Sequence, residues 1–398
     1  MIINKAYNFR MYPTPEQEKT LTSHFGQSRF VYNFFLRKRI DFYVANKDEE
    51  KIGLNYYDTA KMLTELKKQP ETDWLQESNA QVLQQSLRHL DIAYNNFFNK
   101  RAAFPKFKKK QSKQSFTVPQ GFKFDPQKGQ LTIPKMTPLK IIVHREVEGM
   151  IKHITIKKTP SGKYFASLSC EIEKTIKPKQ TGREIGIDLG LKSFLVTSDN
   201  ETIESPKFLQ KSEEKLKRLQ QLLSRKIKGS NRRNKARIKV ARIHETISNQ
   251  RNDFLHKLSH RLVGENQAIY AEDLNVKGIM ANHHLAKSVS DSGWSEFIRQ
   301  IKYKSEWNGV YFGQIDRFFP SSKRCHACGW INESLALAER EWLCQGCGQI
   351  VMRDFNAAQN ILQFGKLNKV GLDKSELPKR PGRPRAVRRV AELGSRLL

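Results

Sequence analysis

Two closely spaced pairs of cysteines constrain the fold of this chain more than any other feature. Cys325 and Cys328 form one C-x2-C pair, Cys344 and Cys347 form the other, and fifteen residues separate the pairs. This spacing is typical of a site in which two tight turns supply four thiolates to one Zn²⁺. Such a site has no open position, so the zinc is expected to be structural. The alternative is four reduced cysteines without metal, and His326 is expected to be a neighbour rather than a ligand.

The charge of the chain points to a polyanionic partner. The sequence has 71 Lys and Arg against 40 Asp and Glu, a formal net charge of +31 over 398 residues. Self-repulsion of this size favours binding to nucleic acid first and to an anionic membrane surface second. No apolar run approaches the roughly 20 residues of a membrane span, and the N-terminus lacks the apolar stretch of a signal peptide. We therefore expect a soluble, intracellular protein that binds nucleic acid.

The first hundred residues have the periodicity of helices. Thr14 and Gln17 can form a capping box around Pro15, which predicts a helix start, with a break at Gly26. A second helix is expected from about Tyr56 to Lys68. A third is expected from about Asn79 to Lys100, where apolar residues recur at helical spacing.

The composition changes after this helical block. Between Lys100 and Lys123 there are eight Lys or Arg and no acid, interleaved with phenylalanines. Short alternating runs then continue to about Lys177, which predicts a small β-barrel or sheet. Residues 207–261 are helical in pattern and carry 17 Lys or Arg against 4 acids, or +13, with a turn at Gly229-Ser230. These basic segments are expected to contact phosphates, although a solvated charged face is the simpler explanation for any single lysine.

Three acids stand where acids are costly or unusual. Asp188 lies within the apolar strand pattern IGIDLG, Glu272 ends the apolar run AIYAED, and Asp354 opens the helical pattern RDFNAAQNI. Singly, each has a simple explanation as a turn former, a strand-end residue or a helix cap. Asp273 should point to the opposite strand face from Glu272, and Asp291 is either an accessory acid or a helix cap.

Taken together, the three acids suggest phosphodiester chemistry. A strand Asp, a strand-end Glu and a helix Asp, in this order, are what a ribonuclease-H-like sheet uses to hold two Mg²⁺ ions. Such ions, about 3.5–4 Å apart, activate water and stabilise the leaving oxygen. Carboxylate oxygens suit Mg²⁺ as thiolates suit Zn²⁺. Ala357 and Ala358 would let the helix that carries Asp354 approach a sheet closely.

The ordered motifs GIDLG, YAEDL, SSKRC-x2-CG, C-x2-CG and RDFNAAQNI resemble the TnpB proteins of insertion sequences, relatives of the type V CRISPR effector nucleases. The openings FRMYPTPEQ and SRFVYNFFL extend the resemblance over nearly the whole chain. The resemblance implies a multidomain α+β fold: a wedge-type β-barrel with an inserted helical recognition lobe, and a RuvC-like (ribonuclease-H fold) nuclease domain with an inserted zinc ribbon. It also implies an RNA-guided DNA endonuclease that cuts next to a short transposon-associated motif.

The resemblance and the segmentation together give expected domain boundaries. These are the wedge barrel at 1–13 and 101–178, the helical lobe at 14–100, the nuclease domain at 182–320 and 351–365, a zinc ribbon that binds target nucleic acid at 321–350, and a basic, disordered tail at 366–398.

The resemblance places the catalytic, Mg²⁺-binding acids at Asp188, Glu272 and Asp354. Met352 departs from the pattern, because many family members have an acid or His at that position, so the surroundings of Asp354 are expected to differ. Nucleic-acid contacts are expected at Tyr56 and Gln84, which resemble the family's motif-reading region, and in the basic segments at Lys106, Lys108, Lys109, Arg232 and Arg233.

The expected partners are a guide non-coding RNA from the element and a target double-stranded DNA, with one protein monomer per RNA. The element's transposase is a further expected partner, and the expected location is the cytoplasm of a prokaryotic cell, at the nucleoid. Two alternatives stay open: a non-catalytic DNA- or RNA-binding regulator of transposition, and an unguided, structure-specific resolvase.

Overall fold

The computed structural model describes residues 1–46, 53–336 and 338–370 of the chain. These residues belong to two compact units. The first unit comprises 1–179, 206–261 and 287–309, and the second comprises 180–205, 262–286 and the chain from 310 onward. Within the described residues, no helix combines the length and the apolar character needed to cross a lipid bilayer.

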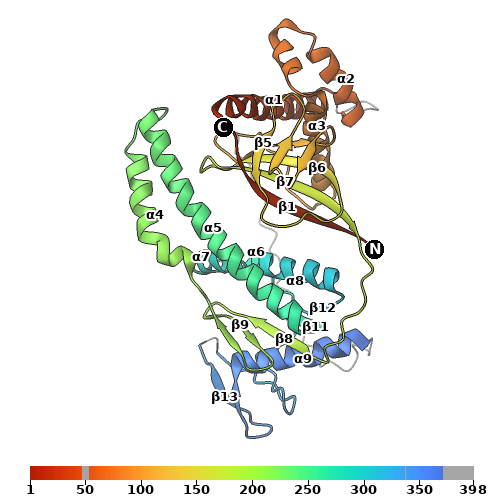
Figure 1. Cartoon of the computed structure of the whole chain (residues 1–398). Coiled ribbons are helices and arrows are strands. Elements are labelled where there is room, and N and C mark those ends of the chain that lie inside the picture. Colours follow the sequence, from red (N-terminus) through yellow and green to blue (C-terminus); the bar gives the residue numbers. More distant parts are fainter. Residues whose placement is uncertain (47–52, 337, 371–398) are drawn as a thin grey trace. The chain divides into compact units, whose positions relative to one another are not determined.

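Three helices open the first unit after strand β1 (Ile2–Tyr12): α1 (Pro15–Ala45), α2 (Tyr56–Leu66) and α3 (Ala80–Phe98) (Figure 1). The predicted capping box at Thr14 is confirmed, because the Gln17 backbone N–H donates to Thr14 Oγ1 and the Thr14 N–H donates to Gln17 Oε1. The predicted break at Gly26 is wrong, and α1 is continuous. A lone glycine costs a helix only about 1 kcal/mol. Packing of its apolar side against α2 and α3 offsets this cost, through Val31, Phe35, Leu36, Leu63, Leu83 and Leu87.

An antiparallel sheet of seven strands follows in the first unit and curls around its own apolar core. Its strands are β1, β2 (Gln114–Val118), β3 (Lys123–Asp125), β4 (Gln130–Thr132), β5 (Leu139–Ile142), β6 (Met150–Lys158) and β7 (Tyr164–Glu173). Their order is β2-β6-β7-β1-β5-β4-β3, so β2 and β3 are edges and the sheet does not close into a barrel. Alternate residues along β1 and β7, such as Phe9 and Leu168, face this core. Cys170 is one of its buried side chains, as a lone strand cysteine often is.

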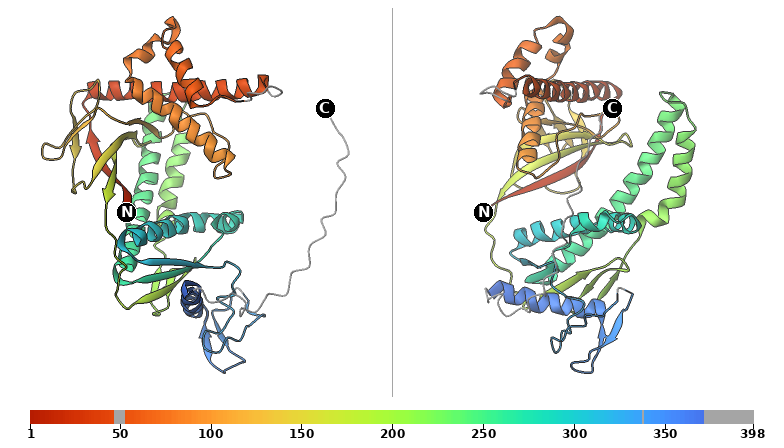
Figure 2. Two further views of the ribbon diagram at one scale, coloured as in Figure 1. Left: turned by 90° about the vertical axis from the view of Figure 1, so that its right-hand side faces the viewer. Right: turned by 180° about the vertical axis from the view of Figure 1, so that it is seen from behind.

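The first unit also contains a long helical hairpin. Helices α4 (Phe208–Ser224) and α5 (Asn231–Glu265) run antiparallel (Figure 2). The predicted turn between them is confirmed, with Gly229 in the left-handed region at φ 86°. Later in the chain, most of α7 (His283–Ser292) and all of α8 (Trp294–Asn308) belong to the first unit, after the short helix α6 (Val276–Met280) of the second unit.

The second unit is built on a sheet of five strands: β8 (Glu184–Leu189), β9 (Ser193–Thr197), β10 (Thr202–Glu204), β11 (Ala268–Glu272) and β12 (Tyr311–Ile315). The order is β10-β9-β8-β11-β12. β11 pairs in parallel with both β8 and β12, whereas β9 pairs antiparallel with β8 and β10. The three parallel strands therefore end at one edge of the sheet.

Helix α9 (Arg353–Val370) packs directly on this sheet. A Cβ added to Gly186 of β8 would lie 2.3 Å from the Ala358 carbonyl oxygen, and one added to Gly365 would lie 2.2 Å from the Tyr270 ring. The expected close approach through Ala357 and Ala358 is confirmed, since both are fully buried. The helix runs five residues further than expected, into 366–370. The rest of the predicted tail lies outside the described residues.

Candidate active site and metal centre

The three predicted acids lie on one face of the five-stranded sheet. Alternate strand residues share a face, so Asp188 lies on the same face as Gly186, which contacts α9. By the same spacing Glu272 shares a face with Tyr270, which also contacts α9. The parallel register pairs Ile187 with Ala271, which places Asp188 and Glu272 side by side at the carboxyl ends of β8 and β11. Asp354 lies in the first turn of α9.

Asp188 and Glu272 both have raised pKa values. The pKa of Asp188 rises to about 7, first through loss of contact with water and then through the negative charges of Glu272 and Asp354. Loss of contact with water also raises the pKa of Glu272 to about 7, with a contribution from Asp273. Among the residues that the structure describes, neither Asp188 nor Glu272 forms an ion pair with Lys or Arg. A cation placed between them would relieve both the desolvation and the repulsion.

Asp354 differs from the other two acids because it has a basic partner. Arg340 Nη1 lies 3.1 Å from Asp354 Oδ1 and 3.4 Å from Oδ2. The three carboxylates are not drawn into a tight cluster: in the described part of the chain, the four cysteines alone bring three or more such ligand atoms within 4.8 Å of one another. The guanidinium of Arg340 thus occupies one side of the Asp354 carboxylate.

The two accessory acids have structural partners. Asp273 pairs with Arg317, away from the trio. Asp291 lies in the first unit, where its carboxylate accepts from the Leu209 N–H at the start of α4 and pairs with Arg251 at 3.3 Å. Of the two interpretations of Asp291, the structure supports the helix cap, although the helix that it caps is α4 rather than its own.

The four cysteines form a compact group in the module of residues 321–350, which includes the short hairpin of β13 (Glu341–Leu343) and β14 (Ile350–Met352). The Sγ atoms of Cys325 and Cys347 are 3.9 Å apart, and those of Cys328 and Cys344 are 3.5 Å apart. Four thiolates around Zn²⁺, each at about 2.3 Å, would be about 3.8 Å apart. The donor set therefore fits a tetrahedral Zn²⁺, as the spacing predicts.

Two buried asparagines of α9 connect this four-cysteine module to the helix that carries Asp354. Asn356 Oδ1 accepts from the His326 backbone N–H at 2.8 Å, and Asn356 Nδ2 donates to the Arg324 carbonyl at 2.7 Å. Asn360 Nδ2 donates to the Ser321 and Arg324 carbonyls at 2.8 and 2.6 Å. His326 thus contacts α9 instead of serving as a fifth ligand.

Sequence reasoning missed Arg340 and the two asparagines. Asn356 and Asn360 are spaced i, i+4 on a helix that must pack on a sheet, and amides at such buried positions signal a hydrogen-bonded contact. No comparable signal marks Arg340, since its place beside Asp354 depends on how the four-cysteine module folds. Met352 lies in β14, is exposed, and pairs with Glu341 across the hairpin.

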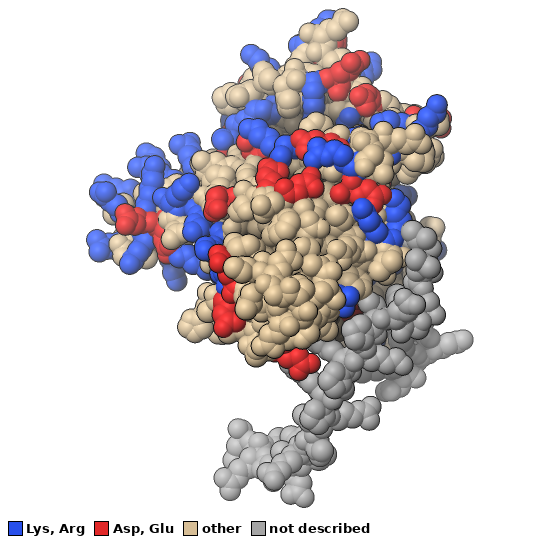
Figure 3. Space-filling view, turned by 90° about the horizontal axis from the view of Figure 1, so that it is seen from below, with Lys and Arg blue, Asp and Glu red and all other residues tan. Residues whose placement is uncertain are grey.

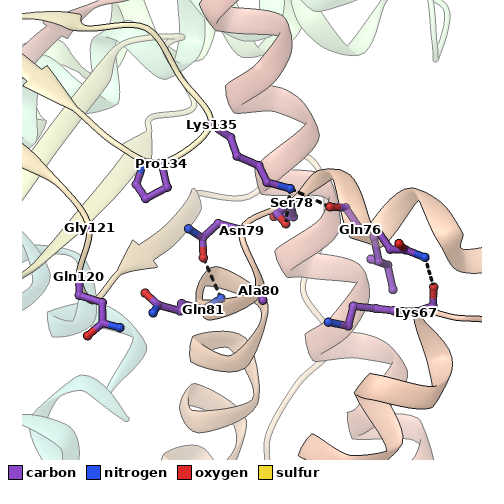
Figure 4. Close-up of a pocket in the computed structure, with 11 residues that line it drawn as sticks. Lys67, Gln76, Ser78, Asn79, Ala80, Gln81, Gln120, Gly121, Pro134 and Lys135 are labelled. Atoms are coloured by element: carbon purple, nitrogen blue, oxygen red, sulfur yellow. Dashed lines mark hydrogen bonds between the residues drawn. The ribbon is translucent and has the colours of Figure 1, made fainter.

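The predicted motif-reading residues lie on α2 and α3 of the first unit. Tyr56 opens α2, where the Arg88 guanidinium covers its ring at 5.3 Å, and Gln84 is exposed on α3. One turn before Gln84, a cavity of about 660 Å³ opens at the N-terminus of α3 (Figure 4). Ser78 Oγ and Gln81 Oε1, at this cavity, have no hydrogen-bond partner within the described residues.

The side chains predicted to contact phosphates differ in whether they already have partners within the protein. Lys106, Lys109 and Arg232 are exposed. Lys108 Nζ lies 3.8 Å from the centre of the Tyr32 ring, and Arg233 Nη1 donates to the carbonyls of Leu223 and Lys226 at the end of α4. Figure 3 shows Lys and Arg side chains gathered over the α4–α5 hairpin, at the left of the view.

Three family models match the chain. The one described as "Probable transposase" matches residues 167–283, the one described as "Cas12f1-like, TNB domain" matches 294–361, and one described as "Helix-turn-helix domain" matches 1–48. Residues 1–46 hold one strand and one continuous helix, so the last description does not fit the local structure.

Curated relatives match over nearly the whole chain. A protein of Streptomyces pristinaespiralis named "Putative RNA-guided DNA endonuclease" is 40% identical over 91% of this chain and 90% of its own length. The "Putative RNA-guided DNA endonuclease InsQ" of Escherichia coli (strain K12) is 34% identical over 91% of this chain and 92% of its own length.

Among solved structures, the protein of a Cas12f1–sgRNA–target DNA complex matches 90% of this chain and 98% of its own, with a TM-score of 0.55 and 14% identity. The fold is therefore that of the Cas12f1-like proteins, a mixed α/β class with a curled half-barrel sheet and a four-cysteine module. Within this class, the chain belongs to the TnpB family.

Proposed function

We propose that the protein is an RNA-guided DNA endonuclease of an insertion sequence, which cleaves DNA next to a short transposon-associated motif. The single observation that carries this proposal is the position of Asp188, Glu272 and Asp354 on one face, where two parallel strands end and α9 begins. Acids that are desolvated and mutually repelling in this way are expected where a cation and a phosphodiester are to be bound.

The five-stranded sheet supports a RuvC-like nuclease domain within this proposal. Three strands in antiparallel succession, followed by two that add in parallel beside the first, are the arrangement of a ribonuclease-H fold. We assign residues 182–320 and 351–365 to this domain and 321–350 to a zinc ribbon that binds target nucleic acid. The wedge half-barrel takes 1–13 and 101–178, the recognition lobe takes 14–100, and the basic tail begins after 370, where α9 ends.

The acids fit Mg²⁺ because carboxylate oxygens are the hard donors that this ion prefers. Asp188 and Glu272 would hold the ions from the strands and Asp354 from the helix. When bound, two Mg²⁺ ions supply an activated water and stabilise the leaving 3′-oxygen. Zn²⁺ on Cys325, Cys328, Cys344 and Cys347 keeps the four-cysteine module folded.

The protein's own residues then orient the reaction. Asp188 and Glu272 keep a fixed spacing because adjacent strands hold their backbones in register. The packing of α9 on Gly186 positions Asp354 over them. Because this geometry is set by backbone pairing and close packing, little reorganisation is needed when the phosphodiester enters.

Nucleic acid would be recognised in two ways. The guide RNA pairs with the target, and the protein holds the paired duplex through its backbone. Tyr56 at the start of α2 and Gln84, one turn after the cavity at the start of α3, are proposed to read the DNA motif. The exposed Lys106, Lys109 and Arg232, with Lys108 and Arg233 beside them, are proposed to contact phosphates. We further propose that one protein monomer binds each RNA. The complex would act on nucleoid DNA in the cytoplasm, together with the element's transposase.

The test is cleavage by the full-length protein loaded with the RNA of its own element, on a matched target library with randomised flanks. Asp188→Ala should abolish Mg²⁺-dependent cleavage, leave RNA binding nearly unchanged and not lower the melting temperature. Asp199→Ala is the matched control, since Asp199 is an exposed acid of the same unit that pairs with Arg183. Wild-type protein that binds RNA but cuts no matched target would favour a regulator of transposition, and cutting of four-way junctions without RNA would favour a resolvase.

A further inference from the structure

Two exposed phenylalanine rings lie where α3 ends and the basic segment begins. Phe98 is 70% exposed and Phe104 is 43% exposed, which is unusual for such large apolar side chains. Both rest on the half-buried rings of Tyr94 and Phe97. We call these four rings the aromatic ledge.

Ring contacts hold the ledge in place. The centroid of Phe104 lies 5.6 Å from that of Tyr94 and 5.3 Å from that of Phe97, both edge-on. Phe98 stacks on Tyr94 at 6.0 Å and tilts against Phe97 at 5.4 Å. Tyr94 is fixed in turn, because the Arg39 guanidinium covers it at 5.0 Å.

The backbone after the helix is also ordered. Lys100 adopts the left-handed conformation at φ 57°, and the N–H groups of Arg101 and Ala102 donate to the Asn96 carbonyl at 2.8 and 3.1 Å. The chain therefore turns back at once and brings Phe104 beside the helix end. The exposed rings are presented on a rigid support rather than on a loose loop.

The basic residues near the ledge indicate which kind of partner it binds. Residues 92–124 contain eight Lys or Arg and no acid. The nearest preceding acid, Asp91, is paired with Arg39 at 2.9 Å. Exposed aromatic rings followed by a run of basic residues match nucleotides, whose bases stack on rings while their phosphates meet the cations. An apolar protein surface would leave these cations without counter-charges.

We propose that the aromatic ledge stacks unpaired bases of the guide RNA, with Lys100 and Arg101 on the adjoining phosphates. The assignment to RNA rests on the proposed function: a guide has unpaired bases before its target arrives, whereas the bases of the target DNA stay paired until the guide displaces a strand. Stacking on Phe98 and Phe104 holds that strand without reading its sequence.

The first experiment uses full-length protein and a short single-stranded RNA that contains 2-aminopurine, whose fluorescence is quenched by stacking. Phe98→Leu keeps the apolar volume but removes the aromatic face. It should lose the quenching and weaken binding by about fivefold to a hundredfold, the range for one lost stacking contact, with the salt dependence unchanged. Arg101→Gln should instead reduce the slope of log K (RNA binding) against log salt concentration by about 0.7, the value for one phosphate contact to a single strand. Ile92→Ala, at a residue on the same helix that is 55% exposed, is the matched control and should behave as wild type.

Equal quenching by wild type and Phe98→Leu would overturn the proposal, as would equal losses in Phe98→Leu and Ile92→Ala. Ultraviolet crosslinking of the protein purified with its RNA identifies the strand: an RNA nucleotide should be joined to the peptide that contains Phe98. A crosslink that forms only after DNA is added would assign the ledge to DNA and refute the RNA assignment. If the wild-type protein showed no guided cleavage, the proposed function would be refuted but the stacking proposal would not. The stacking and crosslinking measurements do not depend on cleavage.

Discussion

Arg340 of the four-cysteine module holds the carboxylate of Asp354 from the first turn of α9, with Nη1 at 3.1 and 3.4 Å from its two oxygens. The pair joins the module to the acid trio, and the backbone reinforces it, since the Arg353 N–H donates to the Arg340 carbonyl at 2.8 Å. A divalent ion at the trio would compete with the guanidinium for the same carboxylate. The Arg340–Asp354 pair is therefore expected to oppose metal binding and to open when metal enters.

Arg340→Gln should strengthen the binding of Mn²⁺, a stand-in for Mg²⁺, in calorimetric titrations. A partly exposed ion pair contributes about 0.2–1 kcal/mol, so the midpoint should fall by about 1.4- to fivefold. Arg299→Gln breaks the Arg299–Glu296 pair in the other unit and should leave the midpoint unchanged. An unchanged or weaker affinity in Arg340→Gln would mean that the guanidinium does not compete with the metal.

The raised pKa values of Asp188 and Glu272 predict how the stability of the metal-free protein depends on pH. The pKa of Asp188 rises from an ordinary 3.8 to about 7, chiefly through loss of contact with water. Because the folded-state pKa exceeds the unfolded one, the stabilising contribution is complete below the unfolded value and is lost as the pH rises through about 7. With chelator present, the melting temperature should therefore fall between about pH 5 and pH 8.

Asp188→Asn removes this titration while keeping the shape of the side chain. The variant should melt higher than wild type at about pH 8, by at least roughly 2–4 °C, which corresponds to about 1 kcal/mol in a domain of this size. The difference should be smaller near pH 5 and should vanish only below about pH 3.8, where the carboxyl is protonated in both the folded and the unfolded state. Asp199→Asn should follow the wild type at both pH values. A difference that does not change with pH would exclude titration of Asp188 as its cause.

Asn356 is predicted to fix the position of α9 relative to the four-cysteine module through its hydrogen bonds to His326 and Arg324. Asn356→Ala leaves the partly buried His326 N–H without its side-chain acceptor and removes one of the two amide donors to the Arg324 carbonyl, which costs about 1–3 kcal/mol. The melting temperature and the cleavage rate should both fall, while the zinc content measured by elemental analysis stays at wild-type level. Gln363→Ala removes only an exposed hydrogen bond to the His326 carbonyl and should have little effect. Zinc loss in Asn356→Ala would show instead that the asparagine supports the metal site.

Much of the acid trio was predictable because each acid interrupts an apolar pattern. Asp188 lies within one apolar strand pattern and Glu272 ends another, and the small residues Ala357 and Ala358 after Asp354 indicate close packing of its helix. Helix limits on α2 and α3 followed from apolar periodicity and capping residues to within two residues. The cysteine spacing alone predicted the thiolate cluster, because a knuckle is a local structure.

The errors concern interactions that no local pattern encodes. The helix around Gly26 continues because α2 and α3 pack on it, and α9 continues to Val370. In this last turn, Lys366 and Lys369 pair with Glu184 of β8. Arg340 reaches Asp354 only after the hairpin of β13 and β14 forms. Asp291 caps a helix more than eighty residues earlier in the chain. Each is a contact between segments distant in sequence, which composition and periodicity do not report.

Gly186 offers the most direct test of how α9 positions Asp354, the proposed catalytic acid of the helix. The Cβ of Gly186→Ala would lie 2.3 Å from the Ala358 carbonyl oxygen and 2.7 Å from the Leu362 nitrogen, both backbone atoms of a rigid helix. The helix must move away from β8, which carries Asp354 away from Asp188. Cleavage should fall by about a hundredfold, the usual effect of misplacing a reacting group by about 1 Å, and the melting temperature should drop.

Gly264→Ala is the matched control for this substitution. Gly264 lies near the end of α5, and an added Cβ would meet nothing within 4 Å. An alanine in a helix is favoured over glycine by about 0.5–1 kcal/mol, so this variant should melt slightly higher and cleave at the wild-type rate. RNA binding should be unchanged in both variants, because the displaced helix belongs to the acid site. If Gly186→Ala cleaved as fast as Gly264→Ala, contact between α9 and β8 would not set the geometry of the trio.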